Sequence, residues 1–544
     1  MPNSKWPQGI PKKLDLPKQS ITQNLINSTL KFPTKCFLFF YGAEYTYETI
    51  LDLVEKLSFY LQKSLKIKPD ERILLYMQNS PQFIISYYAI LHAGAIVVPV
   101  NPMSKEIELS FIQMDTAARV IISGAEIAEF AVPLLRRGHL DHLIVTNNSD
   151  MANTSFDLKK PPFGKALPLE KLEKFGCINW QKLIETSQNI NSVIRLPSDL
   201  AIIAYSSGTT GKPKGCVHTH HNVMVTAVGG VIWHNFGEDS ISLATLPFFH
   251  VTGMQAAMNG PIYAGGTIVV MARWDVQIAV ELIHRYKITH WRAISTMIID
   301  LISDVSIQKY DLSSLKAIGG GGAPMPAAVS KKLKLITGLR YVEGYGLSET
   351  MAATHLNPPN NPKPQCLGKP VFGVISCICS LENSEILGTG EIGEILIAGP
   401  QIFLGYWNNS EETEKVFIEI NGCKFLRTGD VGYVDEDGFF FLTDRLKRMI
   451  NVSGFKVWPN EVETMMYEHP DISEVCVTSK KNSRSCESVK AFIVASRAPP
   501  PKASEIFAWC KDRMANYKCP RSIEYVESLP KSATGKIMWK ELTD

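Results

Sequence analysis

The stretch YSSGTTGKPKG, residues 205–215, combines hydroxyl side chains, glycines and two lysines in one short loop. Glycines let successive backbone N–H groups turn inward without a clash at Cβ, and such groups bind anions. This composition predicts a binding site for polyphosphate. The side chains that add donors and positive charge are those of Ser206, Ser207, Thr209, Thr210, Lys212 and Lys214.

The loop differs from the P-loop of nucleoside triphosphatases, which has a glycine, four residues and then Gly-Lys-Ser/Thr at the start of a helix. Here Pro213 follows Gly211 and Lys212, and Ser206 stands where the leading glycine would be. An ordinary surface turn is the alternative, because Gly, Ser, Thr and Pro dominate turns. The phosphate interpretation therefore depends on the motifs that accompany the loop.

The region before this loop alternates between strand and helix signals. Apolar runs at 72–77, 95–100 and 119–124 predict buried strands, and segments with helical periodicity separate them. Ser80 and Pro81 predict a helix start, with serine as the N-cap and proline at the first helical position. This alternation indicates an α/β fold class, with a parallel sheet covered by helices.

The length predicts more than one domain, because 544 residues exceed what one hydrophobic core normally supports. The composition changes where the aromatic run GFFFLTD meets the charged DRLKR near Arg445. We therefore expect a large α/β N-terminal domain at 1–444 and a small mobile α+β domain at 445–544. Residues 147–198 are polar and interrupted by proline, so we expect them to cross the surface as a long excursion.

Composition and charge exclude several classes of protein. With 56 basic and 53 acidic residues the net charge is only +3, so no basic surface for nucleic acid is expected. No apolar run reaches the length of a transmembrane helix, and the N-terminus lacks a signal core. The eleven cysteines include no CxxC pair, so we expect buried thiols in a reducing cytoplasm.

The other motifs resemble those of the adenylate-forming superfamily, which includes acyl-CoA synthetases, luciferases and peptide-synthetase adenylation domains. They occur in the family's order over roughly residues 40 to 540, so a chance match is very improbable. The motifs are LHAGAIVVPVNP (91–102), TLPFFHVTG (245–253), GGGGAP (319–324), GYGLSET (344–350), GEILIAG (393–399), RTGD (427–430), DRLKRMINVSGFKVWPNEVE (444–463) and PKSATGK (530–536).

The resemblance implies ATP and CoA as cosubstrates and Mg²⁺ as cofactor, and it assigns roles to residues. The implied catalytic residues are Lys536, Glu349 and His250, with Lys536 bridging the attacking carboxylate and the phosphates. The implied metal ligands are Glu349 and Thr209, and Lys447 is the implied hinge between the two half-reactions. The implied ATP- or AMP-binding residues are Ser206, Ser207, Gly208, Thr209, Thr210, Gly211, Lys214, Gly321, Gly322, Ala323, Pro324, Tyr345, Gly346, Ser348, Asp430 and Arg445.

Physical chemistry fits these roles. The Tyr345 ring offers a face for adenine, and the two oxygens of Asp430 match the two ribose hydroxyls. Gly454 and Lys456 resemble the segment that lines the CoA path. Two positions depart from the family pattern. Ser348 replaces a usual threonine and keeps the hydroxyl, and Trp539 stands where a basic residue is usual.

The resemblance implies an AMP-forming acyl-CoA synthetase for a medium- or long-chain fatty acid. A fatty acyl-AMP ligase that loads a carrier protein and an aryl-CoA ligase of the 4-coumarate type stay open. So does a silent nucleotide-binding scaffold, although Glu349 and Lys536 both argue against it. The C-terminal ELTD differs from a peroxisomal SKL signal. Oligomeric state, including a homodimer, and peripheral membrane contact also stay open.

Overall fold

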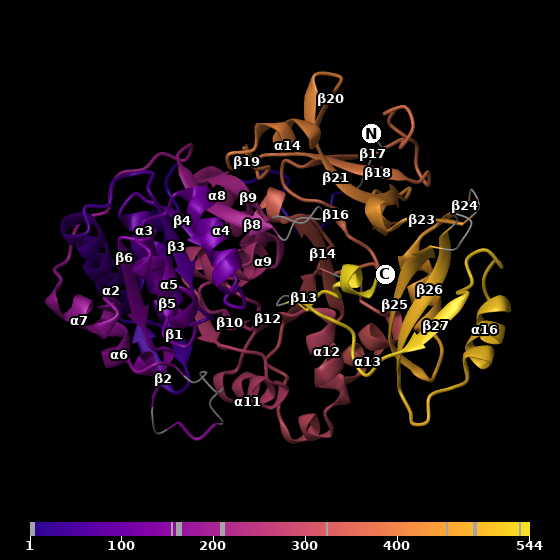
Figure 1. Cartoon of the computed structure of the whole chain (residues 1–544), viewed down its shortest axis with the longest axis horizontal. Helices are drawn as coiled ribbons and strands as arrows, with labels where there is room; N and C mark the ends of the chain where they lie inside the picture. The colour runs from indigo at the N-terminus through magenta and orange to yellow at the C-terminus, as the bar shows by residue number, and fades with distance from the viewer. Residues whose placement is uncertain are drawn as a thin grey trace.

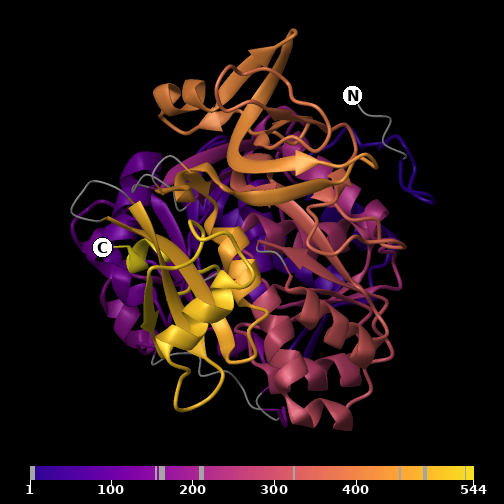
Figure 2. The same ribbon diagram turned by 90° about the vertical axis from the view of Figure 1, so that its right-hand side faces the viewer.

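The protein is described here from a computed structural model. Its N-terminal part holds two helix-covered sheets and a third, antiparallel sheet, and a smaller C-terminal unit packs against them (Figure 1, in yellow). Figure 2 shows this unit in front, with the third sheet above it. The structure describes residues 6–153, 156–158, 166–206, 213–322, 325–452, 455–481, 487–532 and 535–543.

The first sheet has a parallel centre and antiparallel strands at one edge. Its central strands are apolar on both faces because helices cover both sides. Ile73 and Leu75 join one core and Leu74 and Tyr76 the other. In spatial order its strands are β19 (Gly405–Tyr406), β9 (Lys214–Thr219), β8 (Leu200–Ser206), β4 (Ile96–Pro99), β3 (Arg72–Tyr76), β5 (Val120–Gly124), β6 (His142–Thr146) and β7 (Ile178–Asn179).

The helix after β3 starts where Ser80 and Pro81 predict it. Ser80 accepts a hydrogen bond from the Phe83 backbone N–H at 3.1 Å, and Pro81 is the first residue of its helix. The helices and helical turns here are α2 (Tyr47–Phe59), η1 (Tyr60–Ser64), α3 (Pro81–His92), α4 (Glu106–Thr116), η2 (Ala128–Phe130), α5 (Val132–Arg136), η3 (Asn148–Met151), α6 (Leu169–Lys174) and α7 (Trp180–Thr186).

The second sheet is parallel through its middle and ends in antiparallel strands on both sides. Because parallel strands end at the same edge, the loops after β10, β12, β13 and β14 gather there. In spatial order the strands are β16 (Lys369–Pro370), β15 (Ala352–Leu356), β14 (Tyr341–Leu347), β13 (Ala317–Gly321), β12 (His290–Arg292), β10 (Ile241–Ala244), β11 (Thr267–Val270), β1 (Cys36–Phe40) and β2 (Ala43–Thr46).

Helices on both faces bury this second sheet in two cores. One is shared with the first sheet, so the two sheets form one large unit. The helices and turns are α1 (Thr22–Lys31), α8 (His220–Trp233), α9 (Val251–Gly253), η4 (Met254–Asn259), α10 (Gly260–Ala264), α11 (Val276–Tyr286), α12 (Ser295–Ser303), η5 (Val305–Lys309), α13 (Ala327–Thr337) and η6 (Ser348–Thr350).

The third sheet and the C-terminal unit follow in sequence. A short helical turn, η7 (Leu446–Arg448), joins them, and the C-terminal unit has its own buried core. The third sheet contains β17 (Ile375–Cys379), β18 (Gly393–Ala398), β20 (Phe417–Ile420), β21 (Cys423–Val434) and β22 (Phe440–Arg445), with α14 (Ser410–Lys415) beside it. The C-terminal elements are β23 (Ile450–Val452), β24 (Phe455–Val457), α15 (Pro459–Met466), β25 (Ile472–Lys481), β26 (Glu487–Ala495), α16 (Ala503–Lys511), β27 (Ser522–Tyr525) and η8 (Trp539–Leu542).

The predicted fold class is confirmed, with a large α/β part and a small C-terminal domain. The expectation for residues 147–198 is wrong in part. β7 adds a parallel strand beside β6, and Trp180 and Leu183 are buried. Two-residue strands carry no readable period, so only their pairing partner reveals them. The division at 444/445 stays a prediction. No helix in the described part of the chain is long and apolar enough to cross a bilayer.

Candidate active site

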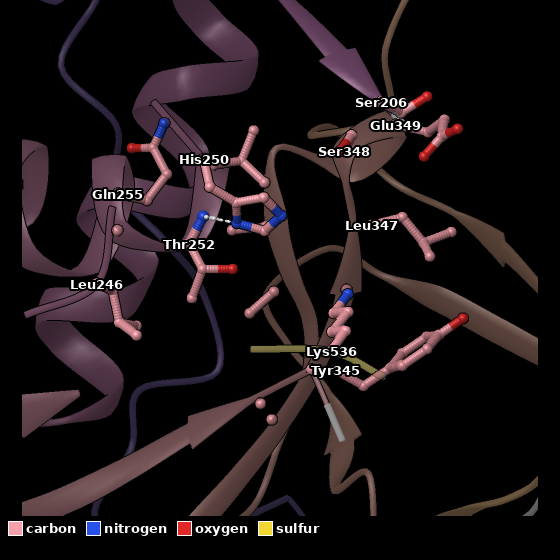
Figure 3. Close-up of a pocket in the computed structure, with 18 of the residues that line it drawn as sticks. Ser206, Leu246, His250, Thr252, Gln255, Tyr345, Leu347, Ser348, Glu349 and Lys536 are labelled. Atoms are coloured by element: carbon pink, nitrogen blue, oxygen red, sulfur yellow. Dashed lines mark hydrogen bonds between the residues drawn. The ribbon is translucent and has the colours of Figure 1, made fainter. Parts of the chain in front are cut away.

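A cavity of about 1030 Å³ opens at the meeting point of the first two sheets, the third sheet and the C-terminal segment. Its wall includes the ends of β8 and β14, the segment 246–256, Arg445 to Lys447 and the last residues of the chain. In Figure 3, Ser206, Ser348 and Glu349 lie at one side, and Leu246, Gln255 and Thr252 lie at the other. The Glu349 carboxylate therefore lies at one side of the cavity, and the apolar Leu246 lies at the other with the uncharged Gln255 and Thr252.

The ends of the glycine-rich loop lie on the cavity wall. Ser206 ends β8 and Lys214 starts β9, and both side chains line the cavity. The Lys214 ammonium pairs with Glu412 and lies 5.0 Å from the centre of the Tyr406 ring. Hydrogen bonds from Lys214 and then Lys415 hold the Glu412 pKa at about 2. Incoming phosphate would compete with Glu412 for Lys214.

Backbone approaches the cavity closely along β13 and β14. A Cβ at Gly321 would lie 2.2 Å from the Gly344 carbonyl oxygen, and one at Gly346 would lie 1.7 Å from that of Ala352. Only glycine fits at these positions. Gly322 has a φ of +99°, and the Lys536 side chain passes 3.2 Å from its Cβ position. These glycines keep side chains out of this part of the cavity wall, where an aromatic base could lie.

Tyr345, Asp430 and Arg445 form one hydrogen-bonded group. The Tyr345 hydroxyl donates to Asp430 Oδ2 at 2.6 Å, and Arg445 Nε lies 3.0 Å from Asp430 Oδ1. Tyr345 and Arg445 line the cavity, whereas Asp430 is only 2% exposed and lies behind them. Burial and then the Asp430 charge raise the pKa of Tyr345 well above its usual value. The Asp430 charge also raises the pKa of Arg445.

Glu349 offers a carboxylate to the cavity from the short turn η6, directly after β14. Its Oε1 accepts a hydrogen bond from the Tyr406 hydroxyl at 2.8 Å. Within the described ranges no three His, Cys, Asp or Glu side chains gather as a ready metal site. The single carboxylate of Glu349 fits Mg²⁺, because this ion binds one or two carboxylates and takes its remaining ligands from phosphate oxygens and water.

Lys536 and His250 approach each other in the cavity (Figure 3). Burial, followed by the nearby Arg445 charge, lowers the Lys536 pKa, while Asp430 and Glu349 oppose that shift. Burial and then the Lys536 charge lower the His250 pKa to about 3, so this ring is neutral near pH 7. His250 Nδ1 accepts a hydrogen bond from the Thr252 backbone N–H at 3.3 Å. The proton of the neutral ring is therefore on Nε2.

Comparison with known proteins decides the family. The sequence profile described as "AMP-binding enzyme" matches residues 27–407, and that of "AMP-binding enzyme C-terminal domain" matches residues 461–536. This chain belongs to the AMP-binding enzyme family. Both matches agree with the resemblance drawn from the motifs.

Full-length relatives of this AMP-binding enzyme include CoA ligases. A long-chain-fatty-acid–CoA ligase of Bacillus subtilis (strain 168) is 34% identical, with 99% of this chain and 97% of the relative covered. A probable 4-coumarate–CoA ligase 1 of Dictyostelium discoideum is 30% identical, with 92% and 90% covered. Among solved structures, the anthranilate CoA ligase AuaEII in complex with anthranoyl-AMP has a TM-score of 0.86 at 27% identity, with 97% of each chain covered.

The structure brings most of the predicted site residues of this AMP-binding enzyme to one cavity. Asp430 lies behind the wall, and Lys456 lies outside it, half-exposed and 4.0 Å from Glu382. The predicted residues on the wall are Ser206, Lys214, His250, Gly321, Gly322, Tyr345, Gly346, Ser348, Glu349, Arg445, Lys447 and Lys536. Those outside the described residues are Ser207, Gly208, Thr209, Thr210, Gly211, Ala323, Pro324 and Gly454. Their roles stay predictions.

Sequence reasoning missed Tyr406 and Glu412, which hold Glu349 and Lys214. Neither stands in a motif that indicates this role, and both reach the site through β19 and α14, far along the chain from their partners. It also missed Arg292. A charged residue within the apolar stretch ITHWRAI was a usable signal, because arginine is rarely buried without a role.

Proposed function

We propose that this protein is an AMP-forming acyl-CoA synthetase that activates a medium- or long-chain fatty acid with ATP and transfers the acyl group to CoA. The observation that carries the proposal is the meeting of Lys536, from the C-terminal segment, with Glu349, Arg445 and His250 in one cavity. The long-chain-fatty-acid–CoA ligase similarity supports the choice of acid. CoA as acceptor is part of the same proposal.

In the first half-reaction the carboxylate oxygen of the acid attacks the α-phosphorus of ATP, and pyrophosphate leaves. Negative charge grows on the phosphoryl oxygens, so fixed donors placed there lower the barrier. Lys536 and Arg445 are cations on the cavity wall, and the Arg445 charge acts on Lys536. We assign Lys536 to the attacking carboxylate and the leaving phosphates, and Arg445 with Tyr345 to the nucleotide.

Glu349 is the residue proposed to hold Mg²⁺. When bound, the ion would neutralise phosphate charge. The Tyr406 hydroxyl, which donates to Glu349 Oε1, fixes the direction of this carboxylate. Thr209, proposed as a second ligand, lies outside the described residues.

His250 is proposed to orient the acid. Its Nδ1 is engaged by the Thr252 backbone, so Nε2–H is the donor directed to the substrate carboxylate. Because its pKa is lowered to about 3, the ring stays neutral near pH 7 and keeps this role. It therefore adds no positive charge that would make the substrate carboxylate a weaker nucleophile. His250 therefore acts by position and not by proton transfer.

The second half-reaction requires a thiol to reach the acyl carbon. In the present arrangement the segment with Gly535 and Lys536 occupies the cavity, and a Cβ at Gly535 would lie 2.3 Å from Ile294. We propose that the C-terminal domain turns at Lys447 and brings the Gly454 and Lys456 segment to the site. Lys456 lies outside the cavity in this arrangement, which fits a role in another one.

An aryl-CoA ligase is the second candidate, because a probable 4-coumarate–CoA ligase and an anthranilate CoA ligase are among the similar proteins. Apolar residues on the substrate side of the cavity, Leu246, Phe249 and Met297 among them, suit either kind of acid. The mostly buried free thiols of the described residues fit a reducing compartment, and we propose the cytoplasm.

A pyrophosphate-release panel tests the proposal. The purified protein is given ATP, Mg²⁺ and acids from acetate to oleate, with aryl acids beside them, each with and without CoA. We expect AMP and pyrophosphate with fatty acids and the thioester once CoA is added. Formation of ADP and phosphate would overturn the proposal. Acyl-AMP without thioester would indicate a carrier-protein ligase, and a strict preference for aryl acids would indicate the second candidate.

A further inference from the structure

A second buried cation lines the same cavity. Arg292 ends β12, and its residue is only 9% exposed. Ser242 pairs with His290 across β10 and β12, and side chains two apart on a strand share a face. Ser242, His290 and Arg292 therefore lie on one face of the sheet, and all three line the cavity.

Arg292 has no carboxylate partner in the part of the chain that the structure describes. Within the described ranges no Asp or Glu forms an ion pair with Arg292. Burial lowers the Arg292 pKa to about 10, and the charge of Tyr341 acts in the opposite direction. The guanidinium packs closely against Gly319, since Nη1 lies 2.9 Å from where a Cβ at that residue would be. A buried guanidinium without a counter-charge is costly, so such groups are normally paired.

His234 and His290 lie near this guanidinium, and its charge adds to burial in lowering the pKa of both rings. His290 Nε2 donates to the His234 carbonyl oxygen at 3.3 Å, and His290 Nδ1 accepts from the Thr289 hydroxyl at 2.8 Å. His234 Nδ1 is buried and has no hydrogen-bond partner among the described residues. Burial and then the Arg292 charge lower the His234 pKa well below its usual value. The cluster thus contains a positive charge at the cavity and an unsatisfied, buried ring nitrogen of His234.

This cluster is separate from the adenylation centre. The charges that act on Lys536 are those of Arg445, Asp430 and Glu349, whereas Arg292 acts on His234 and His290. Burial and the Lys536 charge lower the His250 pKa, and the Arg292 charge is not among the causes of that shift. Arg292 is therefore a cationic point apart from Lys536 and Arg445, and an acid bound by its carboxylate at His250 and Lys536 shares the cavity with it.

We propose that Arg292, which lies beside His234 and His290, binds a second anionic group carried on the acyl chain, so that the preferred substrates are acids with a second carboxylate. The inference rests on the proposed function and narrows its substrate class. Arg292 provides the charge and the fork of N–H donors that match a carboxylate. Apolar residues of the same cavity, Leu246 and Met297 among them, would contact the methylenes of such an acid.

Matched acids test this proposal. Straight-chain monocarboxylic acids, ω-hydroxy acids and α,ω-dicarboxylic acids of six to sixteen carbons are compared by kcat/KM for pyrophosphate release. At the best chain length we expect the wild type to prefer the dicarboxylic acid by about tenfold or more, the factor for one charge-assisted hydrogen bond. Arg292→Met should remove this preference and raise kcat/KM for the monocarboxylic acid. The matched control is Arg340→Met, at an exposed arginine just before β14.

The outcomes separate this inference from the proposed function. Wild-type turnover of monocarboxylic or ω-hydroxy acids with no preference for the dicarboxylic acid at any length would overturn the inference alone, whether or not Arg292→Met folds. So would an equal fall for all acids in folded Arg292→Met. Failure of every acid to release pyrophosphate would overturn the proposed function and the inference with it.

Discussion

Replacing Lys536 with alanine should separate the two half-reactions. Lys536 is one of two cations proposed to contact the reacting groups, and it lines the cavity together with Arg445. Loss of one such electrostatic contact costs about 10²- to 10³-fold in rate, or about 3 to 4 kcal/mol. We expect this loss in adenylation, and little change in thioester formation from supplied acyl-AMP.

Stability should hardly change. Burial lowers the Lys536 pKa from 10.5, so the protonated lysine binds its proton less well in the folded than in the unfolded chain. Below the folded-state pKa this charge therefore opposes folding, and alanine removes the opposition. The lysine stem is lost at the same time, so we expect a net change in unfolding free energy under about 1 kcal/mol.

The assay is ATP–pyrophosphate exchange, followed by thioester formation from acyl-AMP and CoA, with circular dichroism to verify folding. Lys531→Ala is the matched control, because that ammonium pairs with Glu474 at 2.9 Å outside the cavity. The rate of exchange in the wild type should also fall as the pH rises, and the fall should begin below pH 10.5, because the Lys536 pKa is lowered from that value. Normal exchange in Lys536→Ala, or equal loss of both half-reactions in the folded variant, would refute the reasoning.

Three further predictions concern other parts of the site. Glu349→Ala should lower exchange by about 10²-fold or more across a Mg²⁺ titration, with folding intact; near-normal exchange would exclude it as the ligand. Lys447→Pro fixes φ near −65° at the proposed hinge. It should keep much of the acyl-AMP formation and lose most thioester formation, and an unchanged ratio of the two would argue against a turn at this residue. Glu412→Gln releases Lys214 from its ion pair, which is partly exposed. Since such pairs contribute about 0.2 to 1 kcal/mol, the KM for ATP should fall up to about fivefold, and a higher KM would contradict the assigned competition with phosphate.

The sequence by itself determined the elements whose signals are local. Ser80 and Pro81 mark a helix start because an N-cap and a fixed φ act within one turn. The apolar runs at 72–77, 95–100 and 119–124 form buried strands because both sheet faces exclude water. The ordered motifs indicated the family, which the profile matches confirm.

Only the tertiary structure decided which side chains meet. Glu349 meets Tyr406, Lys214 meets Glu412 and Lys536 reaches His250 across long stretches of chain. No local periodicity encodes such pairs, because they arise when separate sheets and the C-terminal unit pack together. The same holds for Arg292. The sequence shows that an arginine stands at this position. Its burial, with no ion pair to a carboxylate of the described residues, depends on the neighbouring strands of the sheet and on α8, because these place the two histidines and Gly319 next to it.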